Sequence, residues 1–313
     1  MLHTGLHIRE DSQRPDLRPA LAAAQEAETL GFDHVWVGDS SRMERGWPRA
    51  DCIAVLAAVA ATTQRLKIGV IPLSAPLRDP VLLAHQLATV DVLSGGRLLV
   101  SPAVGKGGPE GEREFANCGV PYNERGPRLS EMLAIMRRLW TEPSVTFEGR
   151  FYGLNDATIF PKPINRPIPL YVATGRDERG FRRAARYGDG WFTTNHEPET
   201  FAATRRKIEV YAREAGRDPS EVNRIGLYAT FHLNLDGDKA RAEAADHMRA
   251  YFGGHRNTTT DLFGSPQEIA RQLEPLLEAG LSMMVVRFVD EDVPKQLALL
   301  REALAAPRPL SRS

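Results

Sequence analysis

The sequence lacks an excess of charge of either sign, and this absence narrows its function. Lys and Arg together number 40, Asp and Glu also number 40, and the formal net charge at pH 7 is zero. A general nucleic-acid-binding protein carries a basic surplus, so we expect no nucleic-acid partner. Hydrophobic residues make up 42% and charged residues 26% of the chain, which is typical of a globular protein with a sizeable core.

Long apolar runs and cysteines are also scarce. No run approaches the roughly 18 residues of a membrane helix, and the first residues, MLHTGLHIRED, are too polar for a secretory signal. The only cysteines, Cys52 and Cys118, are far apart and form no CxxC pattern. We therefore expect a cytoplasmic protein with reduced thiols, no membrane association and no metal site.

Short apolar runs alternate with longer segments of helical spacing along the chain. Runs without polar alternation are typical of strands covered on both faces, as in a parallel sheet. No GxGxxG follows the first strand, so a doubly wound sheet is disfavoured, and the pattern predicts an α/β TIM (β/α)8 barrel forming one domain over residues 1–313. The predicted strands are Gly5–Ile8, His34–Val37, Leu66–Ile71, Leu98–Val100, Leu170–Ala173, Gly190–Thr193, Gly226–Leu233 and Met283–Phe288. The predicted helices are Leu17–Leu30, Ala50–Thr62, Val81–Leu93, Arg125–Trp140, Glu178–Tyr187, Pro198–Glu214, Lys239–Tyr251, Pro266–Ala279 and Pro294–Leu304.

Two glycines interrupt the segment LATVDVLSGGRLLVS at residues 87–101. We interpret Ser94-Gly95-Gly96 as the end of the third helix and a tight turn into the fourth strand. A helix cap of this kind accounts for both glycines without a ligand.

Two regions break the regular alternation. We expect an insertion over residues 142–168. It begins with a hairpin over Val145–Gly153 that turns at Glu148-Gly149, and proline-rich extended chain follows. The polar segment Gly253–Gly264 is either a mobile lid or a disordered loop.

Several segments, taken in order, resemble the bacterial-luciferase-like superfamily of flavin- and F420-dependent oxidoreductases. The resemblance implies a TIM barrel with an insertion between helix 4 and strand 5, which agrees with the pattern above. It also implies homodimers that pack through early helices, here Ala50–Ala61 and Val81–Leu93. The segments that carry it are GFDHVWVGD at 31–39, PLRDP at 76–80, ATVDVLSGGRL at 88–98, NER at 123–125 with Glu131, LW at 139–140, FEG at 147–149, PIPLYVA at 167–173 and ARYGDGW at 185–191.

Thr174, Gly175, Arg176 and Asp177 follow the fifth predicted strand and precede a helix. Backbone N–H groups at a helix N-terminus can bind a phosphate, and Arg176 could add a charge-assisted bond. A plain connection with Thr174 or Asp177 as the N-cap is the alternative. The resemblance favours phosphate binding, because the family holds the cofactor phosphate at this loop.

Gly105 and Lys106 follow the fourth predicted strand in the segment Gly105-Lys106-Gly107-Gly108. The spacing does not fit a Walker motif. Either this is a flexible lip whose lysine reaches a cofactor phosphate, as a basic residue does in the luciferase branch, or Lys106 is a solvated loop lysine.

At the third strand the family has a non-prolyl cis peptide behind the flavin ring, and the matching residues are Gly69, Val70 and Ile71. We therefore expect Val70 and Ile71 to contact the cofactor. Packing of the barrel core by these apolar residues is the alternative.

Three residues are candidates for catalysis. Asp39 follows the second strand and either contacts the reacting groups or acts as a structural carboxylate that holds Ser41 or Arg42. His7 at the end of the first strand and His232 late in the seventh are possible bases, although a lone histidine in a strand is commonly a packed core residue. F420-dependent dehydrogenases of the family often have His after this aspartate, whereas Ser40 stands here.

The sequence thus predicts an oxidoreductase acting on a small organic substrate. The leading interpretation is a monooxygenase that uses O2 and reduced FMN supplied by a separate flavin reductase. The alternatives are an F420-dependent reductase or dehydrogenase and a non-catalytic flavin-binding barrel. FMN is favoured over F420 because acidic residues interleave with the basic residues of the mouth, which weakens the field for a polyanionic cofactor. Those basic residues are Arg42, Arg45, Lys106, Arg176 and Arg287, and the acidic ones are Glu44, Glu110, Glu112 and Glu178.

Overall fold

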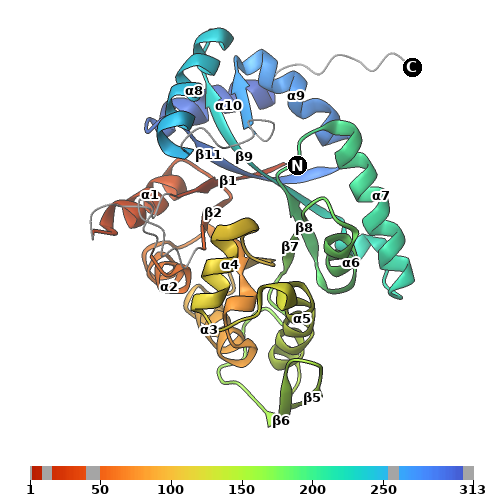
Figure 1. Ribbon diagram of the computed structural model, residues 1–313. Helices are drawn as coiled ribbons and strands as arrows, with labels where there is room; N and C mark the ends of the chain where they lie inside the picture. Colours follow the sequence, from red (N-terminus) through yellow and green to blue (C-terminus); the bar gives the residue numbers. More distant parts are fainter. Residues whose placement is uncertain (1, 9–15, 40–49, 253–260, 306–313) are drawn as a thin grey trace.

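Eight parallel strands form the centre of the molecule, a computed structural model that describes residues 2–8, 16–39, 50–252 and 261–305 (Figure 1). The sheet order is β4-β3-β2-β1-β11-β9-β8-β7, and a parallel bridge between Val100 and Leu170 joins its two edges. The predicted TIM barrel is therefore confirmed. The barrel strands are β1 (His3–His7), β2 (His34–Val37), β3 (Lys67–Ser74), β4 (Leu98–Ala103), β7 (Tyr171–Ala173), β8 (Gly190–Thr193), β9 (Arg224–Leu233) and β11 (Leu281–Phe288).

Helices surround this barrel and connect its strands (Figure 1). Their starts follow local chemistry, since Asp79 caps α3 by accepting from the N–H groups of Val81 and Leu82, and Ser265 and Glu268 form the capping box of α9. The helices are α1 (Arg18–Thr29), α2 (Cys52–Thr62), α3 (Pro80–Leu93), α4 (Gly108–Asn117), α5 (Arg125–Thr141), α6 (Glu178–Tyr187), α7 (Pro198–Glu214), α8 (Gly237–Phe252), α9 (Pro266–Glu278) and α10 (Val293–Ala305). Within the described ranges, none of them is long and apolar enough to cross a membrane.

Alternating side chains of the strands pack into two separate apolar clusters. The larger cluster lies between strands and helices, and the smaller one fills the inside of the barrel, as the two-residue period of a strand requires. Glycines make room for the inner rings, because a Cβ at Gly69 would stand 2.4 Å from the Trp36 ring and one at Gly226 would stand 2.1 Å from the Phe192 ring. The inner cluster consists of Trp36, Ile71, Leu99, Tyr171, Phe192, Met283 and Val285, with Tyr228 against it.

The double glycine at the end of α3 forms a helix cap, as the sequence predicts. The Gly96 N–H donates to the Asp91 carbonyl and the Gly95 N–H to the Val92 carbonyl, which are the two bonds of a Schellman motif. Both glycines have positive φ, +68° and +82°. Arg97 then begins the turn into β4.

Three sequence predictions need correction. The hairpin forms from β5 (Val145–Glu148) and β6 (Gly153–Ala157), so its second strand starts at the residue where the prediction ended it. Residues 253–260 of the predicted lid lie outside the described residues, but Asp261–Gly264 is the strand β10, paired with β9. The predicted helices omit α4, which begins at Gly108.

Candidate active site

Polar side chains replace apolar ones inside the barrel near the carboxyl ends of β1, β9 and β11. Arg287 is directly opposite Thr230 in the strand register, and its guanidinium donates to the Thr230 hydroxyl and, at 3.4 Å, to the Tyr228 hydroxyl. The His7 ring stacks on the Tyr228 ring with centroids 5.3 Å apart. Because barrel active sites form at this end, the cluster His7–Tyr228–Thr230–Arg287 lies where a substrate would bind.

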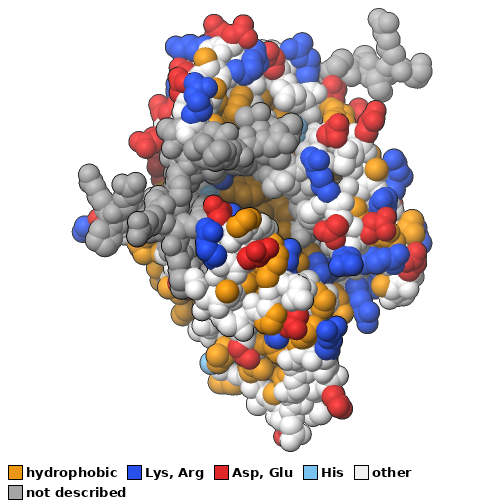
Figure 2. All heavy atoms as spheres, in the orientation of Figure 1, with side chains coloured by type: hydrophobic (Ala, Val, Ile, Leu, Met, Phe, Trp, Pro, Cys, Tyr) orange, Lys and Arg blue, Asp and Glu red, His pale blue; other side chains and the backbone are white. Residues whose placement is uncertain are grey.

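The molecular surface is hollowed on the face above α4, and hydrophobic side chains form the floor of the hollow (Figure 2). His7 and Arg287 have exposed fractions of only 4% and 8%. A buried guanidinium and imidazole are costly to desolvate unless polar groups surround them. Both contact Tyr228, which packs against the apolar inner cluster of the barrel, and polar groups beside apolar ones are typical of a ligand site.

His232 is the penultimate residue of β9 and forms a second polar group at the mouth. Its Nε2 lies 2.9 Å from Glu243 Oε2, and this hydrogen bond is the main reason that the pKa of Glu243 lies below its usual range. Nδ1 of His232 is buried and has no hydrogen-bond partner among the described residues. A carboxylate thus holds one ring nitrogen of this imidazole while the other nitrogen is available, which is the arrangement of an oriented base.

Asp39 is held by protein groups on both carboxylate oxygens. Arg78 donates to Oδ1 and Oδ2 at 2.8 Å each, and the Ser74 N–H donates to Oδ2 at 2.8 Å. Cys52 Sγ also lies 3.4 Å from Oδ1. This geometry favours the structural alternative for Asp39, with Arg78 and Ser74 as its partners, while the predicted partners Ser41 and Arg42 lie outside the described residues.

The segment after β7 combines a firm anchor with open backbone groups. The Thr174 N–H and hydroxyl both donate to the Phe192 carbonyl, at 2.9 and 3.1 Å. Asp177 is the N-cap of α6 and accepts from the Gly180 N–H at 2.9 Å, so the predicted capping role is confirmed for Asp177. In the described structure the N–H groups of Gly175 and Arg176 have no hydrogen-bond partner, and they are available to a phosphate.

Lys106 does not project from a free lip. Its ammonium forms an ion pair with Glu110 in the first turn of α4. The preceding Gly105 has φ +88°, and a Cβ at this position would lie 2.8 Å from the Phe115 ring. Of the predicted segment, only Gly108 lies in α4, whose start is stabilised by the proline at its second position and by the Tyr122 hydroxyl bonded to the Gly108 N–H. Contact of Lys106 with a cofactor phosphate stays a prediction.

Val70 and Ile71 face opposite sides of β3. Ile71 belongs to the inner cluster, whereas Val70 packs toward the helices, so only Ile71 is placed to contact a ring inside the barrel. The cis peptide of this strand joins Ile71 to Pro72. This bond is prolyl, so it is not the non-prolyl cis peptide that the resemblance implies, and none is found among the described residues of β3.

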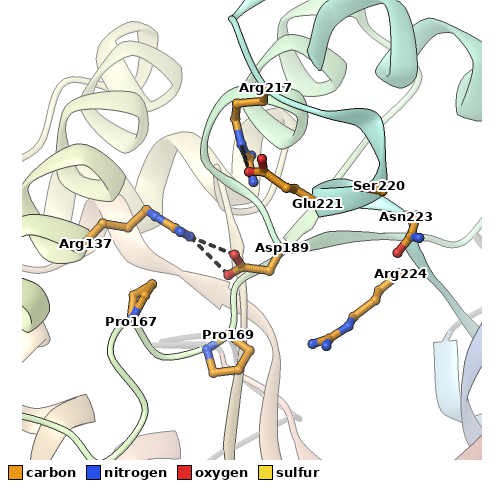
Figure 3. Close-up of a pocket in the computed structure, with 9 residues that line it drawn as sticks. All are labelled: Arg137, Pro167, Pro169, Asp189, Arg217, Ser220, Glu221, Asn223 and Arg224. Carbon is orange, nitrogen blue, oxygen red and sulfur yellow. Dashed lines mark hydrogen bonds and ion pairs between the residues drawn. The ribbon is translucent and has the colours of Figure 1, made fainter. Parts of the chain in front are cut away.

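The amino-terminal end of the barrel also has a pocket, of about 390 Å³ (Figure 3). There, Arg137 pairs with Asp189 at 3.0 Å and donates to the Tyr187 carbonyl, while Arg217 donates to the carbonyls of Ala185 and Gly188 at 2.8 Å. These groups hold the turn between α6 and β8. We assign this pocket a structural role.

The sequence reading missed the partners that complete the site. Arg78 lies in the segment PLRDP, which signalled the family but not its pairing with an aspartate 39 residues away. Tyr228 and Thr230 lie within a largely apolar predicted strand. Only the two-residue alternation of side chains, counted from Gly226, could have placed them inside the barrel.

The family model of luciferase-like monooxygenases matches residues 1–300 of this chain. The chain belongs to the luciferase-like monooxygenase family. It is accordingly an oxidoreductase with the barrel of that family.

Named relatives of this luciferase-like chain include proteins that use F420. It is 29% identical over 290 residues to an F420-dependent glucose-6-phosphate dehydrogenase of Kineococcus radiotolerans, covering 88% of this chain and 80% of the relative. The structure of an F420-dependent secondary alcohol dehydrogenase, with an F420-acetone adduct, superposes with a TM-score of 0.83 and 24% identity over 98% of this chain and 99% of that one. The monooxygenase RslO1 of Streptomyces bottropensis gives 0.78 and 23% over 97% and 98%. At these identities the two structures establish the fold alone.

Proposed function

We propose that the chain is an F420-dependent reductase or dehydrogenase that transfers a hydride between this deazaflavin and a small organic substrate. The observation that carries the proposal is the sequence similarity to the Kineococcus radiotolerans enzyme across 88% of the chain. This similarity supports the F420 alternative better than the FMN monooxygenase favoured by the sequence reading.

Part of the mouth still offers positive charge to an anionic cofactor. Glu110 neutralises Lys106, but Glu178 pairs with Lys207, which is not one of the basic residues expected at the mouth. Arg176 forms no ion pair in the described structure. Its guanidinium is therefore not neutralised by the acidic residue two positions away, and it can act on an anionic cofactor.

The residues present fit a cofactor with a ring and a phosphate. The available N–H groups of Gly175 and Arg176 would hold the phosphate, and Ile71 would contact the ring inside the barrel. When bound, F420 supplies a two-electron hydride donor or acceptor. His232, oriented by Glu243, would hold or accept the substrate proton at Nδ1, and Arg287 would orient an oxygen of the substrate.

Parallel titration of the apoprotein with F420 and FMN, each oxidised and reduced, at fixed salt tests the proposal. We expect F420 to bind at least tenfold more tightly, a difference of about 1.4 kcal/mol. Tighter binding of reduced FMN, with O2 consumption in the presence of a flavin reductase, would instead establish a monooxygenase. Binding of either cofactor with no turnover over a panel of alcohols, aldehydes and enones would indicate a flavin-binding barrel.

We also propose a homodimer that packs through α3. The large apolar side chains of α2 are buried within the monomer, including Leu56 and Val59, so this helix contributes less than expected. On α3, Leu82 is 62% and Leu93 is 56% exposed. Sedimentation at micromolar concentration should show twice the 34.7 kDa chain mass, and a 34.7 kDa species alone would contradict the dimer.

A further inference from the structure

A pocket of about 540 Å³ lies at the outer rim of the barrel mouth, next to the predicted phosphate loop. It is formed by the segments that follow β7 and β8 together with one face of α9. A volume of this size is ordinary for a small-ligand site, which spans roughly 300–1,000 Å³. The lining residues are Arg176, Asn195, His196, Glu197, Pro198, Arg271, Gln272 and Pro275.

The two arginines of this rim pocket carry uncompensated charge. Over the described ranges, neither Arg176 nor Arg271 forms an ion pair or a side-chain hydrogen bond. Some arginines on the neighbouring helices are paired instead, as Arg182 is with Glu214 and Arg205 with Glu209. Two unpaired guanidinium groups that face one concavity attract an anion and give it a bidentate geometry.

The remaining groups of the rim pocket leave this positive balance in place. Glu197 is its only carboxylate, and Oε2 of Glu197 already accepts from the Thr200 hydroxyl at 2.7 Å. Nδ1 of His196 is buried and has no hydrogen-bond partner among the described residues. Burial lowers the pKa of His196, so its ring is neutral at pH 7 and can donate or accept one hydrogen bond.

The location indicates what kind of anion would enter. Arg176 belongs both to the phosphate loop and to the lining of the rim pocket, so a chain attached to the cofactor phosphate would continue into the pocket. FMN ends at its phosphate. F420 continues beyond its phosphate into a tail of glutamate residues, each of which adds a carboxylate.

We infer that the rim pocket binds the glutamate tail of F420, with Arg271 as the residue that recognises a tail carboxylate. The inference rests on the proposed F420 dependence of the enzyme. Arg271 would then contribute to the affinity and selectivity for the cofactor and would not contact the reacting atoms.

Titrations with three deazaflavins test this role. The probes are the 5-deazaflavin alcohol without phosphate, the phospholactyl form without glutamate, and F420 with several glutamates. In the wild-type protein the glutamates should tighten binding about tenfold, and added salt should reduce this gain. Arg271→Gln should abolish the gain and leave the affinity for the two tail-less probes unchanged.

Two further variants make the result specific. Glu197→Gln removes the opposing carboxylate and should tighten binding of the glutamate-bearing form alone. Arg182→Gln removes an arginine of α6 that is paired with Glu214 outside the rim pocket, and it should change none of the three affinities. Equal weakening of all probes by Arg271→Gln, or no change at all, would overturn the assignment.

The outcomes separate this inference from the proposed function. If no deazaflavin binds the wild-type protein while FMN does, the F420 proposal fails. If the three deazaflavins bind the wild-type protein and the glutamates add no affinity, only the tail site fails.

Discussion

The charged groups at the two ends of the barrel differ in how fully they are hydrogen-bonded. At the amino-terminal end, Arg97 donates to the carbonyls of Ala60, Thr63, Leu66 and Ser94 and to the Thr63 hydroxyl. Glu28 at the same end accepts from three consecutive backbone N–H groups. Burial alone would raise the pKa of Glu28, but these bonds to Leu66, Arg65 and Gln64 keep it below its usual value.

At the carboxyl end, several polar groups can form further hydrogen bonds. In the described part of the mouth, Nδ1 of His196, Nδ1 of His232 and the guanidinium groups of Arg176 and Arg271 have no hydrogen-bond partner. Saturated hydrogen bonding stabilises a fold, whereas unsatisfied polar groups cost stability unless a ligand uses them. We conclude that one end is built for stability and the other for binding, as in other TIM barrels.

Asp39 is the exception at the mouth, and the largest expected effect tests it. Asp39→Asn leaves the Arg78 guanidinium, whose side chain is 19% exposed, with only the exposed Asp51 carboxylate, 3.5 Å away, as a counter-ion. We expect a loss of about 3–5 kcal/mol in the free energy of unfolding, measured by urea denaturation. Arg78→Met should lose a similar amount, and the double variant should lose less than the sum. An Asp39→Asn protein as stable as the wild type would show that the pair does not hold the loop.

Arg97→Ala tests the saturated end directly. Removing the guanidinium leaves several buried carbonyls without their donor, and we expect a loss of about 3 kcal/mol in stability. The cofactor affinity of the folded protein should not change. Arg65→Ala is the matched control, because Arg65 is exposed and its side chain forms no hydrogen bond in the described structure; it should stay within about 0.5 kcal/mol.

At the mouth, Arg176→Ala should have the reverse signature. We expect cofactor binding to weaken by about 1.5–3 kcal/mol with little change in stability, because a charge-assisted bond to phosphate is lost. Gly175→Val should also weaken binding by blocking the backbone approach. The first added carbon fits, since a Cβ there has Asp177 Oδ2 at 3.5 Å as its nearest neighbour. Unchanged affinity in both variants would refute the phosphate loop.

A buried histidine at the amino-terminal end gives a pH-dependent test. His34 accepts from Trp36 Nε1 at 2.6 Å, and burial lowers its pKa from 6.5 to about 3. The unfolded chain therefore binds the proton first, so stability is full above pH 6.5 and falls as the pH drops toward 3. We expect His34 to account for about 2 kcal/mol of lost stability between pH 7 and pH 5. His34→Asn keeps the acceptor and should flatten this decline, and an unchanged slope would contradict it.

The barrel could be predicted from sequence because each strand has a recognisable local sequence pattern. β8 is an unbroken apolar run between turn residues, and its bounds, Gly190–Thr193, match the prediction. α4 escaped prediction because its first turn contains Gly108, Pro109 and Gly111, which are signals of a loop. The helix forms because the Tyr122 hydroxyl and the Lys106–Glu110 ion pair stabilise its start.

The candidate site could be predicted only in outline. The ends of the strands indicated where Asp39, His7, His232 and Thr174 would lie. Their partners come from distant positions, as Arg78 does for Asp39 and Glu243 for His232. Such pairings depend on which strands become neighbours, and a single sequence does not encode that in any local pattern.

The smallest expected effect concerns the two glycines of the Schellman motif, which belong to the stable end. Gly95→Ala places a Cβ in open space, with nothing within 4 Å, so the cost is only that of the left-handed backbone, about 1–2 kcal/mol. Gly96→Ala has the same backbone cost but also brings its Cβ to 3.0 Å from Ile164 Cγ2. The Gly96 carbonyl accepts from Asn165 Nδ2 at 2.8 Å, so a shift of this residue would disturb the anchor of the insertion as well. Denaturation of the two variants should therefore rank Gly96→Ala below Gly95→Ala in stability, and the opposite order would show that the turn, and not the contact with the insertion, requires the second glycine.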